Sequence, residues 1–149
     1  MLATLAVITA TVVGLMVGTE FAVAVFVGPM LRRLPAGPSI EASADGARVL
    51  GRVMPFWYVA SLVLTAALAA AGHGAAAGPA IAAAALLAVS VVMSVTLLVP
   101  INNRAATWTA DDHPADWREQ HQRWDRYHYA RVAVIVAAFV LTVVAAALG

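Results

Sequence analysis

Cysteine is absent from the sequence. This absence excludes disulfide bonds, thiol redox chemistry, cysteine-ligated iron–sulfur clusters and covalently attached c-type haem. A membrane quinone–thiol oxidoreductase is excluded for the same reason, although the chain has a similar size. Any chemistry in this chain must therefore come from other side chains.

Lysine is also absent, and charged residues of every kind are few. All 9 basic residues are arginine, and charged residues make up only 11% of the chain. A soluble domain carries roughly 25% charged residues. The use of arginine alone, together with abundant alanine, valine and glycine, predicts a GC-rich bacterial source. The formal net charge of +1 gives no case for nucleic-acid binding.

Apolar residues dominate what is present, at 62% of the chain and a mean hydropathy of +0.85. A membrane helix needs about 20 mostly apolar residues. Four segments meet this requirement, at about residues 2–31, 53–71, 79–99 and 114–148. The sequence therefore predicts an all-α integral membrane four-helix bundle that forms a single domain over residues 1–149. The first segment lacks a basic start and exceeds a signal-peptide core, so we expect it to remain as a helix.

The three connections between these segments differ in kind. His73–Gly78 is a tight turn without formal charge, whereas residues 32–52 predict a longer polar loop that two prolines and a glycine break early. Residues 102–126 form a second polar stretch. Within it, Asp111–Pro114 has the acids and the proline that are typical of a helix start. We therefore expect the fourth helix to begin there, in the cytoplasm, and to run into the membrane without a break.

The arginines predict the topology. Every one lies in or beside the two long connections, and neither terminus carries any. By the positive-inside rule, both long connections lie in the cytoplasm and both termini lie outside. We therefore expect a multi-pass protein of the bacterial inner or plasma membrane, surrounded by the lipid bilayer.

The unusual polar residues of the four segments fall at one depth. At 1.5 Å per residue, Glu20 lies about 27 Å and His128 about 30 Å from the outer ends of their helices. Arg131, Arg52 and Asn102 reach similar depths on their own helices. The sequence thus predicts one polar layer, and with it any functional pocket, at the cytoplasmic side of the bilayer.

The fourth segment carries most of this layer on one face. Its aromatic and ionisable residues recur at spacings of four, three, four and three, which is helical periodicity. They are Trp117, His121, Trp124, His128 and Arg131. The same face continues into the membrane with small and apolar residues, a pattern that suits an amphipathic ligand entering from the interface.

Glu20 and His128 are the leading candidates for catalysis. An ionisable group inside an apolar span is costly, so Glu20 should face the bundle and have a partner. The structural alternative is an ion pair with Arg131 or Arg52, or a carboxyl group that burial keeps neutral. His128 could act in catalysis or ligation, or it could only hydrogen-bond Glu20 or an asparagine amide.

Asn102 and Asn103 follow a proline at the end of the third segment. Pro100 should end or kink that helix and free backbone carbonyl groups. The two asparagine side chains could satisfy those groups, or they could bind a ligand oxygen. Both readings stay open from the residues alone.

Aromatic residues and one further histidine could line the pocket. Trp124 and Tyr58 are candidate pocket walls, although aromatic residues at this depth also form interfacial belts. His121 lies closer to water than His128 and is a weaker candidate.

A metal site is possible but weakly indicated. His121 and His128 lie about 10 Å apart along the helix axis, so they cannot share one ion. A site would need Glu20 and a histidine from another helix, with Glu20 and His128 as the ligands. Haem between two histidines is not supported.

Gly14 and Gly18 form a GxxxG pattern on the first segment. Glu20 points roughly away from this small-residue face. If Glu20 faces the bundle, the glycine face points outward and could support a homodimer.

Three short motifs resemble those of a known family. Gly28-Pro29 ends the first segment, Pro100-Ile-Asn102-Asn103 ends the third, and Trp124-Asp-Arg-Tyr-His128-Tyr-Ala-Arg131 leads into the fourth. Together they resemble the anthrone oxygenase-like family of small four-helix membrane proteins, over nearly the whole chain.

This resemblance implies oxidation of a small hydrophobic anthrone- or phenol-like substrate by molecular oxygen. Such carbon acids react with oxygen once deprotonated, so no cofactor is required. On this reading His128 or Glu20 is the general base, and Asn102, Asn103 and Arg131 stabilise the anion. Trp124 and Tyr58 would pack against the rings.

Two other classes of function stay open. The chain could be a non-enzymatic membrane protein, either a small transporter or an accessory subunit of a larger partner. It could also be a metal-dependent or haem-dependent membrane oxidase.

Overall fold

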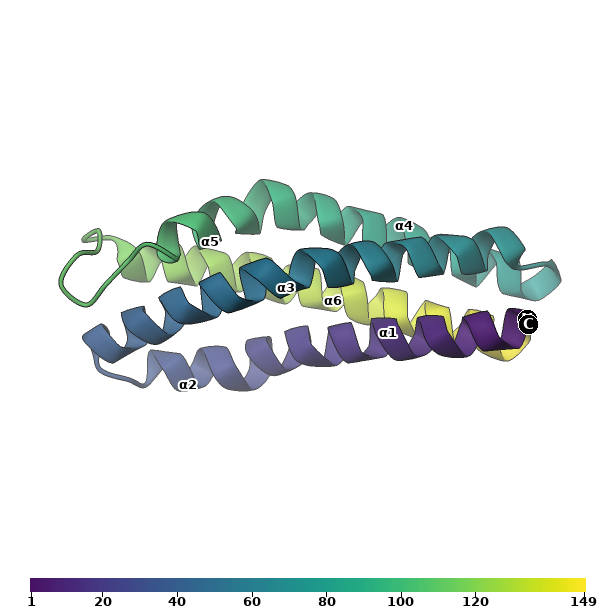
Figure 1. Cartoon of the computed structure of the whole chain (residues 1–149), viewed down its shortest axis with the longest axis horizontal. Coiled ribbons are helices and arrows are strands. Elements are labelled where there is room, and N and C mark those ends of the chain that lie inside the picture. Colours follow the sequence, from purple (N-terminus) through teal and green to yellow (C-terminus); the bar gives the residue numbers. More distant parts are fainter.

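A computed structural model describes all 149 residues, and every regular element in it is a helix. The chain forms four long helical segments, which are Leu2–Arg32, Ala36–Ala71, Gly74–Ala105 and Trp117–Leu148 (Figure 1). The elements are α1 (Leu2–Ala22), η1 (Val23–Val27), α2 (Gly28–Arg32), α3 (Ala36–Ala71), η2 (Gly74–Ala76), α4 (Ala77–Met93), η3 (Ser94–Leu98), α5 (Val99–Ala105) and α6 (Trp117–Leu148). The predicted all-α fold is confirmed.

The four segments pack side by side as an elongated bundle (Figure 1). Helix α1 contacts α3 and α6, and α4 contacts the same two helices, so α1 and α4 lie diagonally across the bundle. Both chain termini lie at one end of the bundle, which we call the terminal end. The opposite end, which we call the loop end, holds residues 33–35 and 106–116.

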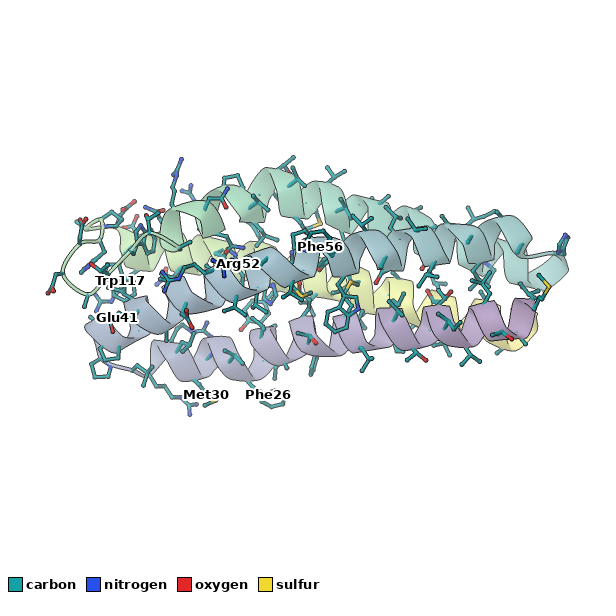
Figure 2. All side chains as sticks on the ribbon, in the orientation of Figure 1. Phe26, Met30, Glu41, Arg52, Phe56 and Trp117 are labelled. Carbon is teal, nitrogen blue, oxygen red and sulfur yellow. The ribbon has the colours of Figure 1, made fainter.

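The outer surface of the bundle is strongly apolar. Phe26, Met30 and Phe56 project away from the helices (Figure 2) and are 59%, 64% and 79% exposed. Four helical segments are long and apolar enough to cross a membrane. Lipid rather than water is the solvent that suits such side chains, and the chain is therefore a multi-pass membrane protein.

Buried apolar side chains fill the middle of the bundle. The central cluster draws on all four segments and consists of Val13, Met16, Val17, Met54, Tyr58, Leu87, Ile135 and Ala138. Towards the terminal end the buried residues become smaller, with Ala6, Leu68, Ala80 and Ala145 in contact. These small side chains leave an apolar cavity of about 200 Å³ at the terminal end, which Ala6, Leu68, Ala80 and Ala145 help to line.

The predicted loop at residues 32–52 is wrong for most of its length. Helix α3 begins at Ala36, and only residues 33–35 connect it to α2. Pro38 lies in the first turn of the helix, where its missing N–H is not needed. The polar segment is helical because Ile40 and Ala44 are buried on one face, with Ile40 packed against two tryptophans of the loop end.

Two π-helical turns, η1 and η3, interrupt the first and third segments. A proline is the second residue after each turn: Pro29 after η1 and Pro100 after η3. The prediction that Pro100 ends the third segment is therefore wrong, because the segment continues through α5 to Ala105. The wider turn lets the Val99 N–H bond to the Ser94 carbonyl oxygen, so the helix accommodates the proline without ending.

The fourth helix begins at Trp117, and Asp116 occupies its N-terminal cap position. The predicted start at Pro114 was therefore slightly too early. Thr109 and Asp112 instead form a turn: the Asp112 N–H bonds to the Thr109 hydroxyl, and the Thr109 N–H bonds to the Asp112 carbonyl oxygen, both at 3.0 Å.

The two glycines of the GxxxG pattern face different surroundings. A side-chain carbon added at Gly14 would lie 2.9 Å from the Phe139 ring of α6, whereas nothing lies within 4 Å of the same position at Gly18. Gly14 therefore faces the interior of the bundle, and the expectation of a shared outward face is wrong for it. A homodimer stays an untested prediction.

Candidate functional site

A buried ion pair lies between α1 and α6. Arg131 Nη2 donates to Glu20 Oε2 at 2.7 Å, and the two residues are only 8% and 4% exposed. Charges in such surroundings are costly unless paired, so each group needs the other. Of the two arginines expected as partners of Glu20, the structure selects Arg131; Arg52 is exposed.

His128 completes this cluster one helical turn from Arg131. Its Nδ1 atom lies 3.1 Å from Arg131 Nη2 and 3.5 Å from Glu20 Oε2, and the residue is 1% exposed. A guanidinium nitrogen can only donate, so Nδ1 accepts this hydrogen bond. The ring proton of the neutral histidine then lies on Nε2, which makes Nε2 a donor rather than a base.

Ser94 and Tyr58 bring the other two helical segments to the cluster. Arg131 Nη1 donates to Ser94 Oγ at 2.8 Å, while Ser94 Oγ donates to the Ser90 carbonyl oxygen at 2.7 Å. The guanidinium carbon also lies 5.2 Å from the centre of the Tyr58 ring, within the range of a cation–π contact. Arg131 is therefore held from three neighbouring segments.

Trp124 covers the other side of His128. The two rings stack with centroids 4.5 Å apart and an angle of 18° between their planes. Residues 124, 128 and 131 follow one another at helical spacing, so a single face of α6 presents all three. The predicted stripe is thereby seen in the structure, and it turns toward the bundle.

Four polar atoms of this cluster are buried and have no hydrogen-bond partner. They are Tyr58 Oη, Trp124 Nε1, His128 Nε2 and Arg131 Nε. Tyr58 Oη lies near the Glu20 carboxylate but makes no hydrogen bond of ordinary geometry with it. Each of the four can donate a hydrogen, given the histidine tautomer above. Buried donors are nearly always paired in proteins, so this group is suited to a ligand that supplies acceptor oxygens.

Three of the predicted site residues lie outside this cluster. Asn102 is half-buried and Asn103 is exposed on α5, and neither makes a side-chain hydrogen bond with Glu20, His128 or Arg131. His121 belongs to an aromatic group at the loop end. Its ring centroid lies 5.4 Å from that of Trp108 and 5.5 Å from that of Trp117.

Sequence reasoning missed Ser94 and the contacts of Tyr129 and Asp125. Tyr129 Oη donates to the Ala24 carbonyl oxygen at 3.0 Å. Arg32 Nη1 lies 2.6 Å from Asp125 Oδ2. No sequence pattern places the Ser94 hydroxyl against a particular arginine.

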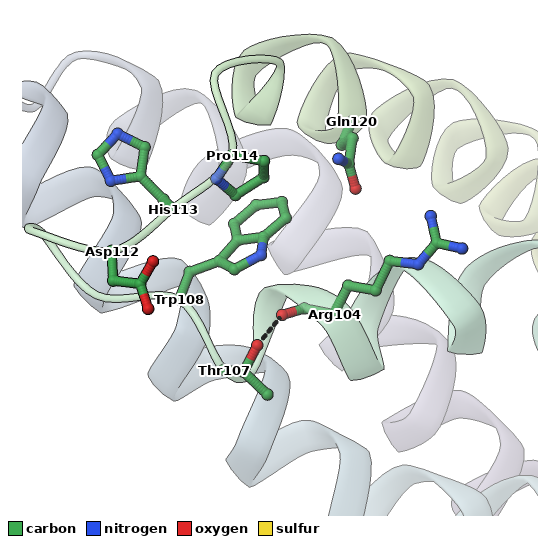
Figure 3. Close-up of a pocket in the computed structure, with 7 residues that line it drawn as sticks. All are labelled: Arg104, Thr107, Trp108, Asp112, His113, Pro114 and Gln120. Carbon is green, nitrogen blue, oxygen red and sulfur yellow. Dashed lines mark hydrogen bonds between the residues drawn. The ribbon is translucent and has the colours of Figure 1, made fainter.

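A polar cavity of about 390 Å³ lies at the loop end (Figure 3). Figure 3 shows Trp108 between Pro114 and Arg104, with Thr107 bonded to the Arg104 carbonyl oxygen at 2.8 Å. The remaining lining residues are Asp112, His113 and Gln120. This cavity shares no residue with the Glu20 cluster and lies outside the apolar part of the bundle, so it does not form part of the same site.

A metal ion finds few ligands in the cluster. No group of three histidine, cysteine, aspartate or glutamate side chains lies close enough together to hold one ion. Glu20 and His128 offer two ligands, but the Nδ1 atom of His128 already accepts a hydrogen bond from Arg131. These residues do not fit the usual set of at least three protein ligands.

The fold and the cluster together define a small helical membrane protein with an internal acid, histidine and guanidinium group. A sequence model described as anthrone oxygenase matches residues 47–141, which is more than half of the chain. The chain belongs to the anthrone oxygenase family. No curated protein and no solved structure matches it.

Proposed function

We propose that the protein is a membrane oxygenase that converts an anthrone-type substrate to the corresponding quinone with molecular oxygen. The observation that carries this proposal is the buried Glu20 carboxylate beside four unpaired donors. A carboxylate can take a proton from a carbon acid, and unpaired donors can hold the anion that results. Membership of the anthrone oxygenase family supports the same substrate class.

The proposed reaction begins with proton transfer. The Glu20 carboxylate takes a proton from the ring methylene carbon opposite the ketone, and the electron pair moves onto the ketone oxygen. The resulting enolate gives one electron to molecular oxygen, and the two radicals combine to form a carbon–oxygen bond. Glu20 returns its proton to the outer peroxide oxygen and then takes the second methylene proton. The electron pair of that carbon–hydrogen bond forms the new ketone and breaks the oxygen–oxygen bond, and the departing hydroxide takes the proton from Glu20 and leaves as water. Atoms balance for one substrate and one O₂ giving one quinone and one water.

Two donors suit the enolate oxygen best. His128 Nε2–H and Arg131 Nε–H are buried and unpaired, and both residues are already fixed by other contacts. Preorganised donors of this kind stabilise a developing negative charge without rearranging. We therefore assign the base to Glu20 and the anion-binding role to His128 and Arg131.

Aromatic and apolar side chains suit the rest of such a substrate. Trp124 stacks on His128, and Tyr58 belongs both to the polar cluster and to the apolar core beside it. Met16 and Met54 lie in the same core, and methionine side chains adapt readily to a ring that displaces them. The proposed substrate therefore has its oxygen at the cluster and its rings toward the core.

The test is oxygen consumption by the purified protein with anthrone. Glu20→Gln keeps the size of the side chain but removes the base, and His128→Ala removes an anion donor. We expect a loss of about 100-fold or more in kcat for each, in line with general-base and anion-donor contributions. Glu41→Gln, an exposed glutamate on α3 (Figure 2), is the matched control and should retain full activity.

Two results would remove the proposal. One is a folded wild-type protein that does not accelerate oxygen uptake by anthrone above the rate in buffer. The other is unchanged turnover in both Glu20→Gln and His128→Ala. Metal analysis of the active preparation tests the metal-dependent alternative, because activity that tracks bound metal would favour that reaction class instead.

We also propose that the loop end faces the cytoplasm. The arginines gather at that end of the bundle, and the terminal end has none. Attachment of a membrane-impermeant label to a cysteine introduced at Arg33 or at Gly149 tests this orientation, since the chain has no cysteine of its own. Labelling of the Arg33 site from outside intact cells would contradict it.

A further inference from the structure

The π-helical turn η1 leaves one backbone carbonyl without its usual donor. The Gly28 N–H bonds to the Val23 carbonyl oxygen instead of to Ala24. The next residue, Pro29, has no N–H to give. The carbonyl oxygen of Ala24, a residue that is 3% exposed, therefore has no partner within its own helix.

Tyr129 supplies the missing donor from α6. Its hydroxyl lies 3.0 Å from the Ala24 carbonyl oxygen. Ala24 lies four residues after Glu20 and so follows it on the same helical face. Tyr129 in turn lies two residues before Arg131, the partner of Glu20.

These contacts form an antiparallel ladder between the first and fourth segments. Along the first segment the contacting residues are Glu20, Ala24 and Arg32. Along α6 their partners are Arg131, Tyr129 and Asp125, in descending order. The Tyr129–Ala24 hydrogen bond is the contact next to the Glu20–Arg131 ion pair. It can therefore fix the height and the rotation of the first segment relative to α6 at Glu20.

The other π-helical turn shows that such a cap is not a general need of the fold. In η3 the Val99 N–H bonds to Ser94, and Pro100 again has no N–H, so the Val95 carbonyl oxygen is left in the same position as that of Ala24. None of the side-chain hydrogen bonds in the structure reaches Val95. The third segment has no carboxylate of its own and its π-helical turn is uncapped, whereas the turn that follows Glu20 in the first segment is capped.

We propose that Tyr129 is a positioning residue that holds η1 in register and thereby places the Glu20 carboxylate against Arg131 and His128. This inference rests on the proposed function for its activity readout. It also makes a prediction about Glu20 that does not depend on turnover.

Tyr129→Phe removes only the hydroxyl group. We expect kcat to fall by about 10- to 100-fold with little change in KM, because a displacement of about 1 Å at a catalytic group can cost about 100-fold. Tyr127→Phe is the matched control, since Tyr127 is half-buried on the same helix and makes none of the side-chain hydrogen bonds of the structure. It should retain the wild-type kcat.

Pro29→Ala provides a rescue that a merely structural role would not predict. The new N–H can bond to the Ala24 carbonyl oxygen from within the helix. We therefore expect Tyr129→Phe to cost much less in kcat when Pro29 is alanine than when it is proline. Equal losses in the two backgrounds would overturn the proposal, as would an unchanged kcat in Tyr129→Phe.

Labelling of Glu20 by a hydrophobic carbodiimide, followed by mass spectrometry, tests the positioning without turnover. The ion pair should protect Glu20 in the wild type and in Tyr127→Phe, and Tyr129→Phe should label several-fold faster. Unchanged labelling would overturn the proposal. If the wild type does not oxidise anthrone, the proposed function fails, while the labelling result still decides the role of Tyr129.

Discussion

Removal of Arg131 is the perturbation that most sharply tests the buried cluster. Arg131→Met keeps much of the side-chain volume but removes the guanidinium group. Glu20, at 4% exposed, then loses its 2.7 Å partner, and Ser94 loses the donor at 2.8 Å. The variant would therefore bury a carboxylate without its counter-charge.

The magnitude follows from the cost of an unpaired buried charge. Breaking a buried ion pair by removing one partner typically costs about 3–5 kcal/mol, whereas replacing both partners by apolar side chains is often neutral. We therefore expect Arg131→Met to lower the free energy of unfolding by about 3–5 kcal/mol. Adding Glu20→Met should restore most of that loss, although the double variant would be inactive.

The assay is denaturant-induced unfolding of the purified protein in detergent micelles, with helix content and tryptophan fluorescence as independent signals. The deciding quantity is the change in the free energy of unfolding when Glu20→Met is added to Arg131→Met. This addition must stabilise the protein. If the two substitutions each destabilise and their effects add, Glu20 and Arg131 are not coupled, and the description of the cluster is wrong.

Two further predictions use the same unfolding assay. Ser94→Ala should cost about 1–3 kcal/mol, because it leaves a buried donor of Arg131 without an acceptor; a loss below the error of the assay would show that this bond is not formed. Gly14→Ala should cost about 1–3 kcal/mol through overpacking against Phe139. Gly18→Ala, in open space, should be neutral or slightly stabilising, and equal effects at the two glycines would contradict the packing described.

The membrane bundle could be predicted from the sequence because composition alone decides it. Four apolar runs of sufficient length leave little choice of fold class, and a helix that spans the apolar part of a bilayer must satisfy its backbone internally. From the sequence, Arg131 and Arg52 were the two expected partners of Glu20, because all three residues lie at similar depths along their helices. The structure then separates them, since Arg131 is buried and Arg52 is exposed.

The extent of the helices could not be predicted in the same way. The segment after Arg33 contains prolines and charges that are typical of loops, but burial of Ile40 against Trp108 and Trp117 makes it helical. That contact joins parts of the chain that are far apart in sequence. Tertiary packing of this kind overrides local preference and leaves no local signal.

The candidate site was predicted in part. Periodicity along α6 brings Trp124, His128 and Arg131 together, as expected. The anion-stabilising roles of Asn102 and Asn103 came from a resemblance of motifs, and neither residue makes a side-chain hydrogen bond with Glu20, His128 or Arg131. The π-helical turns also shift the facing of the residues that follow them, which a regular helical period cannot anticipate.

The most direct test of the central claim is turnover of anthrone by the purified protein under ¹⁸O₂, with mass spectrometry of the quinone. We expect one ¹⁸O atom in each quinone formed by the wild type, with the original ketone oxygen unlabelled, and loss of this product in Glu20→Gln. A quinone whose new oxygen comes from water, or undiminished labelled product in Glu20→Gln, would contradict this claim.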